Sequence, residues 1–171
     1  AVAESVDLPQ VLYNIPGRTG VNMLPATVAR LCGMKNIVGI KEGSGSVQQA
    51  SDIVLACRER LTVLAGDDSL TLPMLAVGAR GVITVAANLV PSEMAKLVST
   101  FVSGHVDESR NIHFRLSPLF TALFYETNPI PVKEALGLMG KITPELRLPL
   151  CPMGADTKAQ LTTVLKDLNL V

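Results

Sequence analysis

The amino-acid sequence predicts an α/β fold, namely the second half of a TIM (β/α)8 barrel (four βα units) followed by a C-terminal helical extension. Short apolar segments alternate four times with segments of helical periodicity, and the strands begin at Val11, Ile37, Leu61 and Gly81. After the fourth unit the alternation stops and the remaining segments are helical. A complete barrel has eight strands in roughly 250 residues, so four units in a chain of 171 residues indicate half of one.

The first two units show the pattern most clearly. Residues 11–15 form an apolar run that Pro16-Gly17 ends, and residues 24–31 have helical character, with a proline suited to the first turn. Residues 37–40 form the second strand. A helix is then expected to begin at Ser46, with its apolar positions on one face. These positions are Val47, Ala50, Ile53, Val54 and Cys57.

The third and fourth units repeat the arrangement, with strands at 61–65 and 81–85 and helices at 70–77 and 92–102. Strands that are almost wholly apolar and alternate with helices are typical of a parallel sheet covered by helices. An open doubly wound sheet has the same local pattern. The helical tail and the number of strands favour the half-barrel.

We therefore expect two parts, a half-barrel over residues 1–105 and a C-terminal helical region over residues 106–171. The helices of the second part are predicted at 106–125 with a bend at Pro118, at 132–139 and at 157–168. Residues 1–6 lack an initiator methionine and resemble the last turns of an amphipathic helix, so we expect the chain to begin within a fold.

Composition narrows the class of function. Fifteen Lys and Arg balance fifteen Asp and Glu without a charged block, which argues against nucleic acid or an anionic membrane surface as a partner. No apolar run is long enough to span a membrane. The three cysteines, Cys32, Cys57 and Cys151, lack metal-ligand spacing and are expected to be reduced thiols in or near the core of a cytoplasmic protein. A small-molecule ligand fits best.

Ligands of parallel α/β folds bind at the carboxyl ends of the strands. Lys41 directly follows the apolar run 37–40, so its amine is expected to enter that crevice. A desolvated lysine favours its neutral form, which attacks carbonyl carbons to form imines. The alternative is a structural lysine paired with Glu42 or with an acid of a neighbouring unit.

Two further side chains are expected in the same crevice. Tyr13 ends the preceding strand, and its hydroxyl can both donate and accept protons beside an imine-forming amine. Arg18 lies in a turn stiffened by Pro16, where its planar guanidinium suits a carboxylate. The alternatives are a core tyrosine with a hydroxyl bonded to the backbone and a solvated loop arginine.

Other signals have simpler explanations. Residues 43–46 form a glycine- and serine-rich turn at a helix start but lack a phosphate-loop ending. Asp67-Asp68 suits the capping of the next helix better than a metal site. His105 and His113 lie in the helical tail and are expected to be surface or packing residues. We therefore expect no metal.

Five segments resemble the dihydrodipicolinate synthases, also called 4-hydroxy-tetrahydrodipicolinate synthases. The wider family also contains N-acetylneuraminate lyase. The resemblance covers essentially the whole chain, and its most specific part is the tyrosine segment followed by the lysine segment 28 residues later. The segments are residues 13–20, 39–45, 66–68, 81–88 and 128–133, which read YNIPGRTG, GIKEGSG, GDD, GVITVAAN and NPIPVK.

The resemblance implies a lyase that condenses pyruvate with aspartate semialdehyde in lysine and diaminopimelate biosynthesis. Lys41 matches the lysine that forms the Schiff base with pyruvate, so no cofactor is implied. Tyr13 matches the tyrosine that relays protons, and Arg18 the residue that holds the carboxylate of the semialdehyde. The family further implies a cytoplasmic homo-oligomer, a dimer or a tetramer.

Three other positions carry weaker matches. Ile83 matches a strand-end residue whose backbone contacts bound pyruvate, and Gly66 and Asp67 match a strand exit that shapes the pocket. Residues 41–45 read KEGSG where many relatives have an alanine in third place, which leaves the lysine unaffected. A threonine pair and a further tyrosine, which the family places in its first four strands, have no counterpart in these residues.

Two alternatives remain open. Cleavage of a sugar acid such as N-acetylneuraminate would use the same lysine and tyrosine, although that branch typically lacks an arginine at the position of Arg18. A non-catalytic half-barrel that acts as an assembly module is the second, because a half-barrel leaves two open sheet edges.

Overall fold

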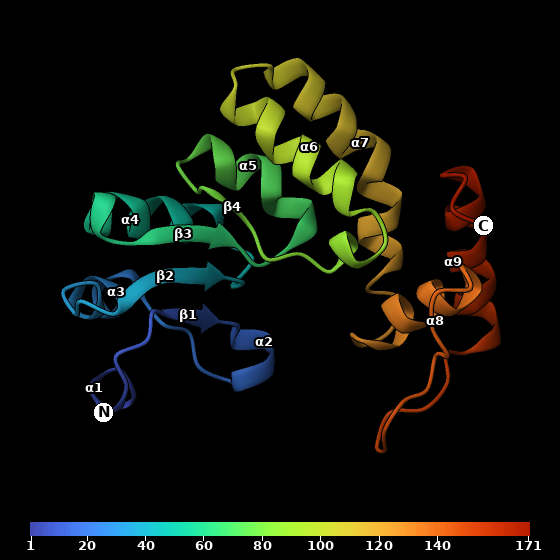
Figure 1. Ribbon diagram of the computed structural model, residues 1–171, viewed down its shortest axis with the longest axis horizontal. Coiled ribbons are helices and arrows are strands. Elements are labelled where there is room, and N and C mark those ends of the chain that lie inside the picture. Colours follow the sequence, from blue (N-terminus) through green and yellow to red (C-terminus); the bar gives the residue numbers. More distant parts are fainter. The chain divides into compact units, whose positions relative to one another are not determined.

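The structure, a computed structural model, describes residues 1–171. The contacts within the chain divide it into two compact units, Ala1–Thr84 and Val85–Val171. Figure 1 shows the ribbon coloured from the first residue to the last. The predicted division at residue 105 stays a prediction.

The unit Ala1–Thr84 is built on a parallel sheet of four strands. Each strand is hydrogen-bonded to the next one along the chain, in the order β1-β2-β3-β4 (Figure 1). A doubly wound sheet reverses its strand order at a switch point, whereas a barrel does not. The order therefore confirms the half-barrel over the doubly wound alternative. The strands are β1 Gln10–Asn14, β2 Ile37–Glu42, β3 Thr62–Ala65 and β4 Gly81–Val82.

Helices connect the strands of this unit. Pro25 begins α3 at the position where a proline loses no helical hydrogen bond. Ser46 caps α4, because its side chain accepts a hydrogen bond of 3.1 Å from the Gln49 amide. The α-helices are α1 Val2–Ser5, α2 Pro16–Thr19, α3 Pro25–Leu31, α4 Val47–Cys57 and α5 Thr71–Ala76, and the short 3-10 turns are η1 Arg58–Arg60 and η2 Asp68–Leu70.

The helices α3, α4 and α5 share one apolar core with a single face of the sheet. The predicted apolar face of α4 is largely correct, since Ala50, Ile53 and Cys57 are buried in this core. Successive strand residues point to opposite faces of the sheet. Because the helices cover only one face, the other face is open. It carries Val11 and Tyr13, both about half exposed.

The local differences from the sequence prediction include strand ends, one turn and one cysteine. β2 runs to Glu42, so Lys41 lies within the strand. β4 ends at Val82 rather than at residue 85. The turn predicted around Arg18 is the single helical turn α2. Cys32 and Cys57 are buried as expected, but the expectation of a core position for Cys151 is wrong, because this thiol is exposed.

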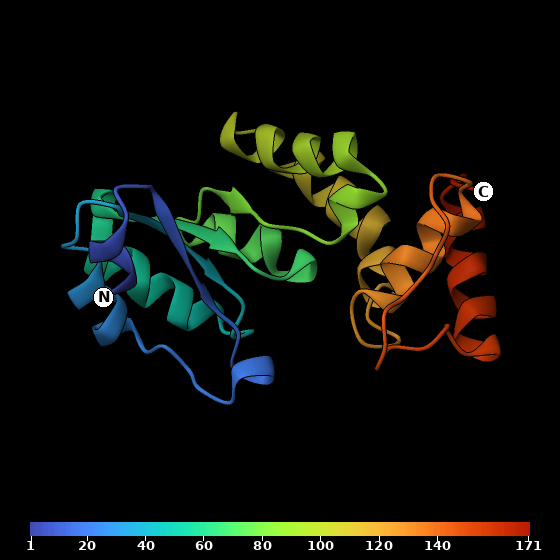
Figure 2. The ribbon, with the colours of Figure 1, turned by 60° about the horizontal axis from the view of Figure 1, so that its bottom comes forward.

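The unit Val85–Val171 is helical. α6 and α7 lie side by side in both views (Figures 1 and 2), and the Ser109 hydroxyl of α7 donates a 2.7 Å hydrogen bond to the Leu97 carbonyl of α6. α9 packs against α7 and α8. No helix of the structure has both the length and the apolar character needed to cross a membrane. The elements are η3 Ala86–Asn88, α6 Pro91–Val102, α7 Val106–Ala122, which contains Pro118, α8 Ile130–Leu138 and α9 Ala155–Asp167.

Glu126 ties the segment after α7 to the start of α9. Its carboxylate accepts hydrogen bonds from the Gly154 amide at 2.9 Å and from the Thr157 hydroxyl. These donors hold the pKa of Glu126 below its ordinary value of 4.5, the Thr157 hydroxyl having the larger effect. The unfolded chain therefore binds this proton more readily, so the stability that the interaction contributes is present above about pH 4.5 and is lost as the pH falls.

We expect Glu126→Gln to lower the thermal midpoint at neutral pH and to flatten the fall of that midpoint on acidification. A neutral amide accepts fewer strong hydrogen bonds and does not titrate. Circular dichroism melts of both proteins between about pH 7 and about pH 3 would measure the two slopes. Equal slopes would contradict the assignment.

Candidate active site

Tyr13 and Lys41 lie side by side at the carboxyl ends of β1 and β2. The two residues are register partners in the parallel pairing of these strands. Each is followed by a buried residue, Asn14 or Glu42, whose side chain points to the helix-covered face. The side chains of Tyr13 and Lys41 therefore belong to the open face of the sheet. Two candidate catalytic groups, 28 residues apart in sequence, are thus adjacent in space.

The amine of Lys41 lies over the tyrosine ring. Its Nζ atom is 4.3 Å from the centroid of the Tyr13 ring, a distance typical of cation–π contacts. Glu42, the partner considered for a structural lysine, is on the other face of β2 and is fully buried. Lys41 takes part in none of the ion pairs of the chain. The Tyr13 ring, and not an ion-pair partner, is therefore the neighbour that the structure gives to the charged amine.

Arg18 belongs to the short helix α2, which begins two residues after β1 ends. The side chain is exposed, and its element leaves the sheet at the same end at which Tyr13 stands. Gly20 closes the turn with φ +72°, and its amide donates to the Pro16 carbonyl at 2.9 Å. This conformation favours glycine. The chain thus places Arg18 shortly after the carboxyl end of β1.

Gly66 directly follows β3 and lies against the end of β2. Its amide donates to the Glu42 carbonyl at 2.7 Å. A Cβ atom at this position would lie 2.8 Å from both the Glu42 carbonyl oxygen and the Gly43 Cα atom. Asp67 follows and caps η2, accepting hydrogen bonds from the Ser69 amide at 2.9 Å and from the Ser69 hydroxyl at 2.8 Å. These contacts support the capping interpretation of Asp67.

We expect Gly66→Ala to force β2 and β3 apart beside Lys41. Both atoms in the way belong to the backbone and cannot rotate aside, so the cost is that of overpacking, about 1–3 kcal/mol in the free energy of unfolding. Urea unfolding measures it. Gly33→Ala is the matched control, because its nearest neighbour would be the Arg30 carbonyl at 3.8 Å. A loss no greater than that of the control would show that the strands tolerate the methyl group.

Ile83 directly follows β4 and continues its pairing. Its amide donates to the Ala65 carbonyl at 2.9 Å, which places it beside the residue that precedes Gly66. The side chain is 41% exposed. All six candidate residues therefore lie in Ala1–Thr84, either near the carboxyl end of a strand of this sheet or in the segment that follows it.

Sequence reasoning missed the polar residues behind this site. Asn14 and Glu42 follow Tyr13 and Lys41 directly, and both are buried on the helix-covered face of the sheet. Asn14 Nδ2 donates to both carboxylate oxygens of Glu42, at 3.0 and 3.3 Å. The strict alternation of side chains in strands could have shown that neither residue shares the face of Lys41.

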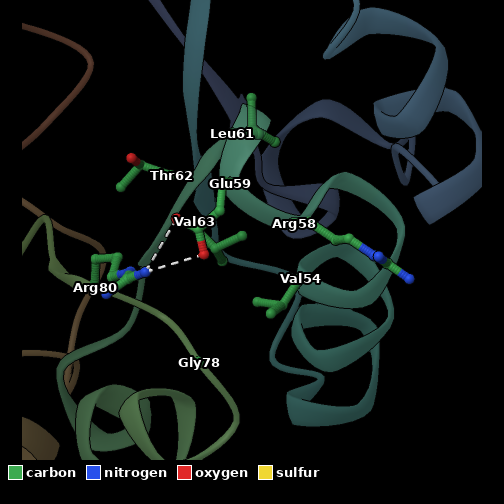
Figure 3. Close-up of a pocket in the computed structure, with 8 residues that line it drawn as sticks. All are labelled: Val54, Arg58, Glu59, Leu61, Thr62, Val63, Gly78 and Arg80. Carbon is green, nitrogen blue, oxygen red and sulfur yellow. Dashed lines mark hydrogen bonds and ion pairs between the residues drawn. The ribbon is translucent and has the colours of Figure 1, made fainter.

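The cavity in Figure 3 lies at the opposite ends of the strands. It has a volume of about 80 Å³ and lies by the starts of β3 and β4, where Val54, Thr62, Val63 and Gly78 are among the residues that line it (Figure 3). Arg80 Nη2 is paired with Glu59 Oε2 at 3.4 Å, and the guanidinium of Arg58 points away from this pair (Figure 3). Sites for small molecules usually measure roughly 300–1,000 Å³, so we do not assign a substrate site there.

Known proteins resemble the chain along its whole length. The 4-hydroxy-tetrahydrodipicolinate synthase of Geobacter metallireducens is 54% identical over 171 residues, which are 100% of this chain and 59% of that protein. The dihydrodipicolinate synthase of Thermotoga maritima superposes with a TM-score of 0.97 at 46% identity, over 99% of this chain and 59% of that one.

A further crystal structure, of the chloride-inhibited dihydrodipicolinate synthase of Acinetobacter baumannii complexed with pyruvate, gives a TM-score of 0.96 at 37% identity, over 99% of this chain and 58% of that one. The chain thus spans about three fifths of the length of these relatives. Residues 1–168 match the Dihydrodipicolinate synthetase family. The chain therefore belongs to this family.

Proposed function

We propose that the whole protein is a lyase that condenses pyruvate with aspartate semialdehyde to form 4-hydroxy-tetrahydrodipicolinate, on the route to lysine and diaminopimelate. The observation that carries the proposal is the Lys41 amine, 4.3 Å above the Tyr13 ring at the carboxyl ends of two parallel strands. The names of the relatives support the reaction, and the pyruvate complex of the Acinetobacter protein supports the first substrate.

The proposed reaction begins with attack of the Lys41 amine on the keto carbon of pyruvate. Water leaves and an imine forms. The Tyr13 oxygen, which has given its proton to the departing water, takes a proton from the methyl group of the imine. The resulting enamine carbon attacks the aldehyde carbon of the semialdehyde. The aldehyde oxygen takes up a proton and becomes the hydroxyl of the product. Finally the amino group of the condensed product attacks the imine carbon, closes the ring and releases the lysine amine.

Tyr13 is the proposed proton carrier for these steps. Its ring already contacts the lysine amine, and a phenol hydroxyl can both donate and accept. It can protonate the departing oxygen of the first addition and the aldehyde oxygen of the second. The protonated imine accepts the electron pair that remains when its methyl group loses a proton, so the proposed reaction requires no metal and no cofactor.

Three contacts with substrate are proposed around this pair. Arg18 holds the carboxylate of the semialdehyde through parallel hydrogen bonds. The backbone of Ile83 contacts bound pyruvate, while Gly66 and Asp67 shape the end of the pocket. Gly66 does so by letting β3 approach the carbonyl of Glu42, as its 2.7 Å hydrogen bond indicates. We also propose a cytoplasmic homo-oligomer, a dimer or a tetramer, which sizing of the whole protein tests.

A comparison of two aldehydes, each supplied separately, tests the proposed substrate. The whole protein is supplied with pyruvate and either aspartate semialdehyde or N-acetylmannosamine, and product formation is followed. We expect turnover with the semialdehyde. Arg18→Ala should lower kcat/KM for the semialdehyde by about 10- to 100-fold, the loss of charged hydrogen bonds, while pyruvate imine formation continues.

Arg30→Ala is the control for the loss of an exposed arginine, because Arg30 lies in α3, outside the strand ends. It should leave kcat/KM unchanged. Preferential turnover of N-acetylmannosamine, with no effect of Arg18→Ala, would instead indicate a sugar-acid lyase. Absence of imine formation with any keto acid would indicate a non-catalytic assembly module.

A further inference from the structure

A buried polar cluster lies directly behind the candidate active site. It consists of Asn14, Glu42 and Gln49, joined at the surface by Asn22. The side chain of Glu42 is 0% exposed and that of Asn14 is 2% exposed. Each of these two residues follows a candidate catalytic residue in the same strand, and they are register partners of each other. The cluster therefore repeats, on the covered face, the pairing of Tyr13 and Lys41 on the open face.

The carboxyl group of Glu42 is the centre of the cluster. Its Oε1 atom accepts from the Ser44 amide at 2.8 Å and its Oε2 atom from Gln49 Nε2 at 3.2 Å. Asn14 Nδ2 donates to both oxygens. Glu42 belongs to none of the ion pairs of the chain. Every partner of the two oxygens is a neutral amide donor, so the cluster satisfies the carboxyl group without an ion pair.

The cluster ties four segments together. Asn14 Oδ1 accepts from the Met23 amide at 2.9 Å, and Asn14 Nδ2 also donates to Asn22 Oδ1 at 2.9 Å. Asn22 and Gln49 exchange two hydrogen bonds, of 2.9 and 3.0 Å. The ends of β1 and β2 are thus connected to the segment before α3 and to the first turn of α4. Few other orientations satisfy so many groups at once.

This arrangement leaves the ends of β1 and β2 little freedom to move. The backbone ladder continues beyond the strands, because the Gly43 amide donates to the Asn14 carbonyl at 2.8 Å. Holding Asn14 and Glu42 from behind also holds the peptide units that set the directions of Tyr13 and Lys41. A misplacement of roughly 1 Å in reacting groups can lower a rate by about 100-fold.

We propose that Asn14 and Glu42 are positioning residues for the Tyr13–Lys41 pair. They touch no substrate and act by fixing the relative position of the ring and the amine. The inference rests on the proposed imine chemistry of Lys41. A cluster with a purely structural role would affect unfolding, but it would leave the chemistry of the folded protein unchanged.

Two isosteric substitutions change the hydrogen-bond donors and acceptors of the cluster while keeping the size of its side chains. Glu42→Gln places an amide where the Ser44, Asn14 and Gln49 donors converge, so one donor must face another. Asn14→Asp places a second carboxylate against Glu42. The double variant Asn14→Asp/Glu42→Gln exchanges donor and acceptor, and the pair can bond again after rotation of the neighbouring amides.

The measurement is the rate at which borohydride traps pyruvate on Lys41 in the whole protein at saturating pyruvate, well below each melting temperature. We expect each single variant to slow this limiting rate by about tenfold or more, with a smaller change in the pyruvate concentration at half saturation. The double variant should recover part of the loss. Ile53→Val, a core change in α4 that leaves the cluster intact, is the control for lowered stability alone.

The outcomes separate the two proposals. Wild-type rates in folded Glu42→Gln and Asn14→Asp would overturn the positioning role while leaving the imine chemistry intact. An equal loss in Ile53→Val would overturn it too, since stability alone would then explain the effect. A natural protein that forms no adduct on Lys41 would overturn the proposed function and this inference with it. If the two single variants do not fold, Gln49→Met removes one donor to Glu42, and a folded variant with wild-type trapping then counts against the inference.

Discussion

Replacing Lys41 with arginine is expected to abolish turnover of keto acids by the whole protein. A guanidinium keeps the positive charge and can remain over the Tyr13 ring, which Lys41 now contacts at 4.3 Å. It cannot attack a carbonyl carbon and lose water to form an imine. Loss of a covalent nucleophile typically lowers kcat by a factor on the order of 10³ or more. Product formation with pyruvate and aspartate semialdehyde measures the effect.

Lys35→Arg is the matched control for this change. The side chain of Lys35 is 92% exposed, and its Nζ atom lies 3.9 Å from Oδ1 of its ion-pair partner Asp7. The control should keep the activity of the natural protein. If Lys41→Arg retained activity within about tenfold of that level, covalent chemistry at Lys41 would be excluded, and the amine would have at most an electrostatic role.

Tyr13→Phe is expected to have the second largest effect. The substitution keeps the ring beneath Lys41 and removes the hydroxyl alone. General acid–base groups typically contribute a factor of about 10²–10⁴, so we expect a loss of kcat in that range, while the amine stays in position and still reacts with pyruvate. Steady-state kinetics together with trapping of the imine measure the two parts separately.

The only other tyrosine of the chain supplies the control. Tyr125 is 36% exposed and lies after α7, in the unit Val85–Val171. Tyr125→Phe should leave kcat unchanged. If Tyr13→Phe also left kcat unchanged, the hydroxyl would not carry protons, and Tyr13 would act through its ring alone.

Much of the fold follows from periodicity, and the exceptions lie at strand ends. The apolar run before Lys41 stops at Ile40, but β2 continues to Glu42 because backbone pairing does not depend on apolar side chains. The fourth strand differs in the opposite direction, because it is shorter than the sequence predicts. Residues 81–85 are apolar or β-branched, yet the chain leaves the sheet after Ile83 has bonded to Ala65, and Val85 has helical dihedral angles at the start of η3.

The candidate site was predictable at the level of which residues meet. Residues at the carboxyl ends of two neighbouring parallel strands lie close together, and the register shows that Tyr13 and Lys41 are partners. What local reasoning missed was the face of each side chain. Glu42 was considered as an ion-pair partner of Lys41, whereas strand alternation turns it towards Asn14 and Gln49.

Peptide mapping after borohydride reduction tests the central claim most directly. The whole protein is incubated with pyruvate and borohydride, digested, and analysed by mass spectrometry. Hydride addition to the imine carbon converts the reversible adduct into a stable secondary amine, so the modified side chain can be identified. We predict a single adduct, on Lys41, and none in Lys41→Arg. An adduct on another lysine, or none in the natural protein, would contradict the account.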